Sequence, residues 1–243
     1  MSARVPGEAP AGGRVLVVAT RSPHKLGELR QLLHLPRTRL VSLDDIGVVE
    51  EAPEDGDTFE ANAVFKARYY AELSGLPTLA DDSGIEVDAL GGMPGVRTRR
   101  YAGEQATDED NNVKLLAALR GLPPERRGAR YRCVLAFVEP PASDRSALRG
   151  AAPSARPGVG RPERPAAEPP ARHATVRRGT FEGRIADGPR GSGGFGYDPI
   201  FEPAWEPPGG RTVGLYSSEE KNRVSHRAAA ARAMRRVLIQ RGY

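Results

Sequence analysis

The stretch Val15-Leu16-Val17-Val18-Ala19, followed at once by Thr20-Arg21-Ser22-Pro23, decides the fold class of this chain. The first run is short, apolar and β-branched, which is typical of a strand that is buried on both faces of a sheet. Ser22 is a suitable helix N-cap, Pro23 suits the first helical position, and leucines then recur at helical spacing until Pro36. A strand that passes directly into a helix predicts a βα unit.

Further strands and helices alternate along the chain, which places it in the α/β class. A second helix is predicted to begin at Asp57, which has capping-box spacing to Glu60, and to end near Ser74-Gly75. A third helix is predicted to begin at Thr107. The remaining predictions are strands over 78–80, 130–138 and 175–185, and a last helix from about Ser218 or Ser225 to Gln240.

Composition narrows the classes of function. The net charge of +5 suits an anionic partner, which could be nucleic acid or a small phosphorylated substrate. The single cysteine, Cys133, excludes an internal disulfide and a cysteine cluster for zinc. No apolar run approaches the roughly 20 residues that span a bilayer, and residues 1–13 lack the apolar part of a signal peptide. We therefore expect a cytoplasmic protein with no membrane partner.

One segment differs sharply from the rest of the chain. Residues 139–172 consist mostly of Pro, Ala, Gly, Ser and Arg, and such a sequence cannot offset its ordering entropy by burying apolar surface. We predict a disordered surface insertion there and a flexible N-terminus over residues 1–13.

Two features of the N-terminal half suit phosphate groups. The turn Thr20-Arg21-Ser22-Pro23-His24-Lys25 combines the free amides of a helix N-terminus with hydroxyl and cationic side chains, although an ordinary polar cap would look the same. Lys66 shares a helix face with Phe59, Ala63 and Tyr70, which we expect to be buried. Its ammonium must therefore either extend to solvent or meet an anion.

The pair Asp81-Asp82 follows the predicted strand over 78–80 and precedes Ser83-Gly84. Ligands of α/β proteins generally bind beyond the strand ends, so we expect both carboxylates to point into a crevice there. Together with Glu54, the pair could supply the oxygen ligands that magnesium prefers. A turn capped by aspartate is the structural alternative.

Two features of the C-terminal half suit a nucleobase. In Gly193-Gly194-Phe195-Gly196-Tyr197-Asp198 the glycines allow close approach of the backbone to a ligand, and Phe195 can offer its face to a base. Lys221 and the run Ser225-His226-Arg227 place donors at a helix start, where they suit a carbonyl or phosphate oxygen. A glycine-rich turn and a solvated basic helix end are the structural alternatives.

Five of these motifs, in this order, resemble those of the Ham1 (inosine triphosphate pyrophosphatase) family. The resemblance covers roughly Val15 to Gln240 apart from the insertion. The motifs are Ala19-Thr20 through Lys25, Thr58-Phe59-Glu60-Ala61-Asn62 through Lys66-Ala67, Ala80-Asp81-Asp82-Ser83-Gly84, Gly194-Phe195-Gly196-Tyr197-Asp198-Pro199, and Ser225-His226-Arg227.

The resemblance implies a two-lobed α/β domain over residues 14–243, with an elongated mixed sheet flanked by helices, a central substrate cleft and usually a homodimeric assembly. It implies a Mg²⁺-dependent hydrolase that converts non-standard purine nucleoside triphosphates (ITP, dITP, XTP) to monophosphate and pyrophosphate, which keeps them out of DNA and RNA. By position, Asp82 would be the general base and a metal ligand, and Glu54 the second metal ligand. The substrate-binding residues would be Thr20, Arg21, Ser22, Pro23, His24, Lys25 and Lys66 around the triphosphate, and Ser83, Phe195, Gly196, Tyr197, Asp198, Lys221, His226 and Arg227 around the nucleotide.

The chain departs from the family pattern in its first loop. Ser22 stands where the family usually has asparagine, and His24 replaces a residue that is often small. Two other functions would also account for part of the sequence. A Maf-type pyrophosphatase would prefer standard or modified pyrimidine nucleotides. A basic nucleic-acid-binding module would use the arginine-rich insertion and the last helix, but it gives the carboxylates no task.

Overall fold

The computed structural model describes residues 13–140 and 174–243. The flexible start predicted for residues 1–13 and the insertion predicted for residues 139–172 lie almost wholly outside these residues. Within the described part of the chain, no helix is both long and apolar enough to cross a membrane.

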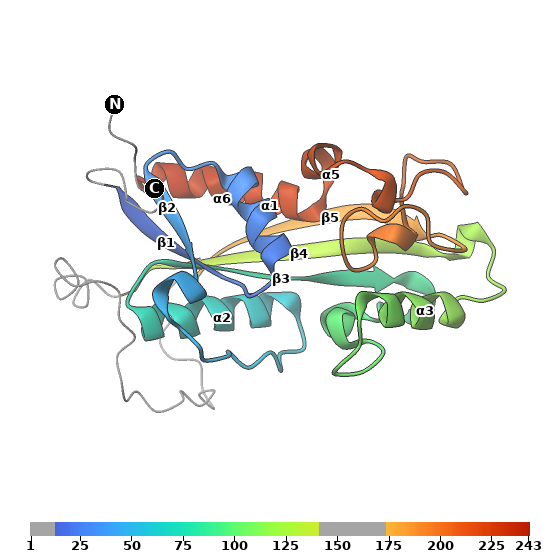
Figure 1. The fold of residues 1–243 in the computed structure, drawn as a ribbon, viewed down its shortest axis with the longest axis horizontal. Helices are drawn as coiled ribbons and strands as arrows, with labels where there is room; N and C mark the ends of the chain where they lie inside the picture. The colour runs from blue at the N-terminus through green and yellow to red at the C-terminus, as the bar shows by residue number, and fades with distance from the viewer. Residues whose placement is uncertain (1–12, 141–173) are drawn as a thin grey trace.

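A single six-stranded sheet, in the order β2-β1-β3-β4-β5-β6, runs through the described residues (Figure 1). β1 is parallel to β2 and to β3, whereas β4, β5 and β6 follow β3 in antiparallel pairs. The chain is therefore an α/β protein with a mixed sheet, as predicted. The strands are β1 (Arg14–Ala19), β2 (Thr38–Ser42), β3 (Thr78–Val87), β4 (Gly128–Val138), β5 (Thr175–Ile185) and β6 (Phe201–Pro203).

Helices cover both faces of the sheet (Figure 1). α1 and α6 lie on one face, and α2 and α3 lie on the other. Ser22 caps α1, as predicted, because its side chain accepts a hydrogen bond from the Lys25 amide. The helices are α1 (Pro23–Leu33), α2 (Phe59–Ser74), α3 (Asp108–Ala118), α5 (Ser218–Val224) and α6 (His226–Gln240).

Two predicted boundaries were wrong. α2 is capped by Thr58 and not by Asp57, because the Thr58 hydroxyl accepts a hydrogen bond from the Ala61 amide at 3.1 Å. The strand predicted to end at residue 80 continues to Val87, because β4 pairs with β3 along its whole length. Asp81 and Asp82 therefore lie within a strand and not beyond its end.

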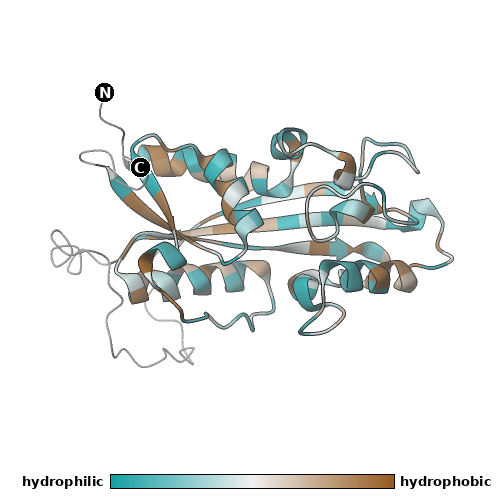
Figure 2. Cartoon of the chain, in the orientation of Figure 1, coloured by the Kyte–Doolittle hydropathy of each residue, from teal (hydrophilic) through white to brown (hydrophobic). Residues whose placement is uncertain are grey.

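The hydrophobic core consists of three clusters along the sheet. One lies between the sheet and α2, a second lies under α1 and α6, and a third lies at the far end near α3. In Figure 2, brown stretches on β1 and β2 contrast with the mixture of teal and brown along the helices. Burial on both faces of β1 explains why its sequence is an unbroken apolar run.

The last helical region is broken at Ser225, which ends α5 and caps α6. Of the two starts predicted for one last helix, Ser225 is correct for α6, and the segment from Ser218 forms the separate helix α5. α6 approaches β5 closely at Gly179, where a Cβ atom would lie 2.0 Å from the His226 carbonyl oxygen. Only glycine permits this approach, which brings the start of α6 onto the sheet.

Candidate functional site

The candidate site lies where β1 ends and β3 continues. β1 pairs with β3 only as far as Ala19 and Ala80, so the two following residues of β3, Asp81 and Asp82, lie beside the first turn of α1. Successive residues of a strand point to opposite faces of the sheet. The expectation that both carboxylates point into one crevice was therefore wrong.

Asp82 faces α2. Its carboxylate accepts hydrogen bonds from the Asn62 side-chain amide and from the Lys66 ammonium, both at 3.2 Å. Lys66 Nζ also donates to Glu54 Oε1 at 2.9 Å and to the Asp81 carbonyl oxygen at 2.8 Å. The Lys66 side chain is buried, so its ammonium meets anions and does not reach solvent.

The pKa values of this group are shifted by burial and by charge. Burial raises the pKa of Asp82, and the nearby ammonium groups of Lys66 and Lys25 offset only part of that effect. Burial also acts to raise the pKa of Glu54, but Lys66 holds it below its ordinary value. For Lys66, the carboxylates outweigh burial and raise its pKa, so the lysine stays charged.

The donor set of Glu54 and Asp82 fits a hard divalent cation. Both carboxylates contact the same ammonium group, so they lie close enough to share one positive charge. Magnesium commonly takes one or two carboxylates and fills its other positions with water and phosphate oxygens. Among the described residues no group of three or more His, Cys, Asp or Glu side chains forms a closed metal site.

Asp81 faces α1 and α6, and both of its carboxylate oxygens have partners. One oxygen contacts Lys25 Nζ at 2.6 Å and accepts a hydrogen bond from the Ser83 hydroxyl at 3.0 Å. The other accepts from Arg227 Nε at 3.0 Å and from the Cys133 thiol at 3.2 Å. Burial alone would raise the pKa of Asp81, but Arg227 and Lys25 hold it well below its usual range. Asp81 thus stays ionised and joins two cations.

Ion pairs extend from Arg227 toward the glycine-rich loop. The Arg227 guanidinium pairs with Glu28, and Glu28 Oε1 lies 2.9 Å from the Lys221 ammonium. Lys221 in turn lies 2.6 Å from Asp198 Oδ2. Despite its burial, Glu28 has a lowered pKa because Arg227 and Lys221 stabilise its charge. Negative and positive side chains therefore alternate from one predicted part of the site to the other.

Glu28 was not assigned a role from the sequence, and Asp81 was considered only as part of a possible magnesium site with Asp82 and Glu54. Glu28 lies three residues after Lys25 on α1, so the two side chains lie on the same face of the helix. That spacing indicated that Glu28 lies near the site, although it could not identify the partners of Glu28 on α5 and α6.

Phe195 lies at the opposite end of these ion pairs. Its amide donates to Asp198 Oδ2 at 2.9 Å, and the Lys221 ammonium lies 4.1 Å from the centre of its ring. The His24 imidazole stacks on Phe195, with ring centres 5.2 Å apart and planes inclined by 14°. Gly194 adopts a φ of +74°, and a Cβ atom there would lie 2.0 Å from Asp198 Oδ2. This loop conformation therefore requires glycine.

His226 is buried beside the same cluster. Its imidazole stacks on Tyr131, with ring centres 4.7 Å apart and planes inclined by 5°, and its Nδ1 has no hydrogen-bond partner among the described residues. Tyr131 also donates a hydrogen bond to Asp198 Oδ1 at 3.2 Å. Burial and the neighbouring cations Arg227 and Lys221 hold the pKa of His226 well below its ordinary value, so the ring is neutral.

Several predicted site residues lie outside the cluster. Arg21 turns away from the carboxylates and donates to the carbonyl oxygens of Val48 at 2.9 Å and Glu50 at 3.0 Å. The remaining ones have structural contacts: Thr20 Oγ1 accepts from the Ser22 amide, Pro23 occupies the first helical position, the Gly196 amide donates to Asp108, and the Tyr197 hydroxyl donates to the Thr98 carbonyl.

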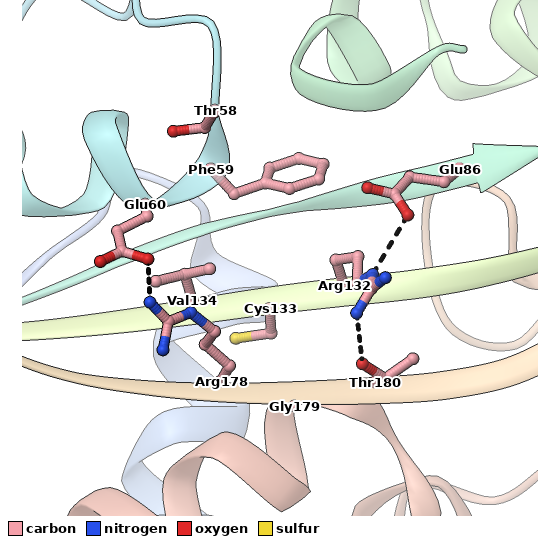
Figure 3. A pocket seen from close by; sticks show the side chains of 10 residues that line it. All are labelled: Thr58, Phe59, Glu60, Glu86, Arg132, Cys133, Val134, Arg178, Gly179 and Thr180. Atoms are coloured by element: carbon pink, nitrogen blue, oxygen red, sulfur yellow. Dashed lines mark hydrogen bonds and ion pairs between the residues drawn. The ribbon is translucent and has the colours of Figure 1, made fainter. Parts of the chain in front are cut away.

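The face of the sheet between α2 and α3 is hollowed, and no predicted site residue lines its two cavities of about 190 and 660 Å³. Figure 3 shows the smaller one, where Arg178 pairs with Glu60. Arg132 bridges Glu86 and Thr180 there at 3.1 Å each. Because carboxylates accompany these arginines, the smaller cavity lacks the unbalanced positive charge expected of a nucleic-acid groove.

Comparisons with known proteins show which proteins this chain is similar to. A protein of Symbiobacterium thermophilum that is named dITP/XTP pyrophosphatase is 44% identical over 93% of this chain and 98% of its own length. Another of that name, from Methylococcus capsulatus, is 42% identical over 90% and 92%. The structure of a HAM1 protein from Coxiella burnetii matches with a TM-score of 0.73 and 34% identity over 93% of this chain and 99% of that one.

The family model described as the Ham1 family matches residues 16–153 and 166–237. These ranges contain both carboxylates of the Glu54 and Asp82 pair, the lysines that contact them, the glycine-rich loop and the start of α6. By this match and by its relatives, the chain belongs to the Ham1 family.

Proposed function

We propose that this protein hydrolyses non-standard purine nucleoside triphosphates such as dITP, ITP and XTP to the nucleoside monophosphate and pyrophosphate. One observation carries the proposal. The Lys66 ammonium contacts Glu54, Asp82 and the backbone carbonyl oxygen of Asp81. From the Asp81 side chain, ion pairs then alternate through Arg227, Glu28 and Lys221 to Asp198, in the loop that presents Phe195. A nucleotide-binding site needs one part that binds phosphates and another that binds a base. The names of the relatives support the same reaction.

Asp82 is assigned as the general base. A base must be within reach of the water that attacks phosphorus, and a raised pKa strengthens its pull on a proton. Burial raises the pKa of Asp82, whereas Asp81 is held ionised by two cations and makes a poor base. The oxygen of the attacking water forms a bond to phosphorus as its proton passes to Asp82. The bond between the α- and β-phosphates breaks, and the monophosphate and pyrophosphate are the products.

Lys25 and Lys66 are assigned to the triphosphate. Phosphoryl transfer requires mainly positioning and neutralisation of negative charge. Both ammonium groups already contact the carboxylates of β3, at 2.6 Å for Lys25 and Asp81 and at 3.2 Å for Lys66 and Asp82. The N-terminus of α1 lies beside Lys25, and the positive end of the helix dipole there favours an anion.

Glu54 and Asp82 would hold Mg²⁺. The metal ion would neutralise charge on the phosphate oxygens. Hydrogen bonds of 3.2 Å from Asn62 and Lys66 orient the Asp82 carboxylate for this role.

Arg227 is assigned to the base. A guanidinium has five N–H groups, and three of those on Arg227 donate to Asp81, Glu28 and Ser83. The remaining N–H groups can donate to the 6-oxo group of hypoxanthine or xanthine. Adenine carries an amino group at this position and would leave the donors unpaired, a mismatch that costs a factor on the order of 10⁴ where hydrogen bonds decide recognition.

The proposal includes a homodimer, as the family resemblance implies, and a cytoplasmic location, as expected from the single cysteine. Sedimentation of the purified protein tests the dimer, because a monomer and a dimer of this chain differ twofold in mass.

The reaction is tested by incubating the purified protein and Mg²⁺ separately with dITP, XTP, GTP, dATP and dTTP. We expect dITP and XTP to yield monophosphate and pyrophosphate, and Asp82→Asn to lose turnover by at least about 10³-fold while its circular dichroism spectrum is unchanged. Release of orthophosphate would contradict the mechanism. Preference for dTTP would favour a Maf-type enzyme, and salt-sensitive DNA binding that persists in Asp82→Asn without any turnover would favour a nucleic-acid-binding module.

A further inference from the structure

His24 belongs to the first turn of α1, yet its side chain contacts the base end of the site. The imidazole stacks on Phe195, with ring centres 5.2 Å apart and planes inclined by 14°. The next residue, Lys25, points instead to Asp81, with Nζ 2.6 Å from the carboxylate. Consecutive residues of one turn therefore reach different parts of the site.

The two rings differ in how firmly they are held. Phe195 is half-buried, and the pairing of its amide and carbonyl groups with Asp198 fixes its loop. His24 is exposed, and its side chain can rotate away without disturbing the core. A planar ligand that enters between the rings needs a spacing of about 7 Å, so a displacement of His24 by about 2 Å makes room for it.

We propose that His24 supplies the second aromatic face of the base pocket, so that a purine ring binds between His24 and Phe195. This inference rests on the proposed function. It assigns His24 to the nucleobase and not to the triphosphate, although it adjoins Lys25 in the sequence. Stacking is tolerant of base identity because every base has a π-face, so His24 contributes affinity and leaves discrimination to hydrogen bonds such as those of Arg227.

Two ligands distinguish a role of His24 in binding the base from a role in binding the phosphates. Inorganic tripolyphosphate carries the phosphates without a base, and dITP carries both. Their affinities are measured by calorimetry in the Asp82→Asn background, where turnover does not interfere, and the KM and kcat for dITP are measured in the otherwise unchanged enzyme. The variants are His24→Ala and His24→Phe. His34→Asn is the matched control, because it removes an exposed histidine from the other end of the same helix.

We expect His24→Ala to weaken dITP binding and to raise its KM by about five- to tenfold, with kcat within about twofold of the original. His24→Phe restores affinity because it retains a stacking face, and His34→Asn has no effect. Tripolyphosphate binding stays unchanged in all variants.

Two results would overturn the proposal. Equal weakening of dITP and tripolyphosphate in His24→Ala would place His24 at the phosphates, and unchanged dITP affinity would remove it from the site. Failure of the proposed function is distinct, because it would appear as orthophosphate release or absence of turnover by the unaltered enzyme.

Discussion

His226 makes the stability of the protein depend on pH. Its pKa lies well below the ordinary value of 6.5 because it is buried, with Arg227 and Lys221 nearby. Below pH 6.5 the His226 imidazole binds a proton in the unfolded chain but stays neutral in the folded chain. The free energy of unfolding therefore falls as the pH is lowered toward the pKa of His226 in the folded protein. The contribution of one such group is at most about 1.4 kcal/mol per pH unit.

Urea denaturation between pH 8 and pH 5 measures this effect. In His226→Phe, which retains a ring to stack on Tyr131, we expect the decline in unfolding free energy below pH 6.5 to become shallower. His34→Asn replaces an exposed histidine and should leave the decline as it is. An identical pH dependence in wild type and His226→Phe would mean that His226 titrates normally in the folded protein.

The residues of the site differ in how far the sequence revealed them. Lys66 could be recognised because a lysine on a buried helix face needs an anion, and it contacts Glu54 and Asp82. The separate tasks of Asp81 and Asp82 could not be recognised, because the sequence did not show that they lie within a continuous strand. Arg21 was misleading, since a cation in a phosphate-suited turn can equally bind backbone carbonyls of another loop.

Among the structural elements, the junction between α5 and α6 has the most direct effect on the site. Ser225 ends α5, where its amide donates to the Lys221 carbonyl at 2.9 Å, and its hydroxyl caps α6 by accepting from the Ala228 amide at 3.2 Å. Its extended conformation separates α5, which carries Lys221, from α6, which carries Arg227. One buried cap therefore positions both cations.

Ser225→Ala removes the cap of α6. We expect the unfolding free energy to fall by about 1 kcal/mol, as for other lost N-caps, and the KM for dITP to rise a few-fold because Arg227 and Lys221 lose their fixed orientation. Ser217→Ala is the control, since Ser217 caps α5 in an exposed capping box. It should lower stability without changing KM, and an equal KM change in both variants would contradict a role of the junction.

Element prediction succeeded where local chemistry decides the boundary. Ser22 and Thr107 cap helices as their side chains suggest, because an N-cap depends only on residues within one turn. It failed for β3, whose length is set by its pairing with β4 about 50 residues later in the chain. The glycine and polar residues after Ala80 are typical of a turn. Pairing with β4, which is distant in the sequence, stabilises a strand there despite this local preference.

At the scale of the whole molecule, the sheet order explains the position of the site. β3 is parallel to β1 on one side and antiparallel to β4 on the other. β1 ends at Ala19, and the chain leaves the sheet into α1, so β3 has no partner strand on that side at Asp81 and Asp82. Farther along, Glu86 forms a bridge with Pro94 on the same edge. The βα unit was predictable from the first motif, but the strand order depends on contacts that no local pattern encodes.

The same sheet order makes residues 141–173 replaceable. β4 ends at Val138 and β5 begins at Thr175, and Phe137 pairs directly with Thr175 in an antiparallel register. Neighbouring antiparallel strands can be joined by a short hairpin loop. We therefore expect that a loop of about five residues rich in Gly and Asn, placed between Pro140 and Ala174, preserves the kcat and KM for dITP within about twofold.

The shorter loop should also stabilise the protein by roughly 1–2 kcal/mol in urea denaturation, because a shorter loop costs less entropy to close. Tyr243 and Arg241 contact Glu139, so the replacement must begin after that residue to leave the end of α6 in place. A control with a scrambled segment of the original length separates the effect of length from that of sequence. Loss of turnover in the shortened protein, but not in the scrambled one, would show that the site needs the length of this segment, and loss in both would show that it needs its sequence.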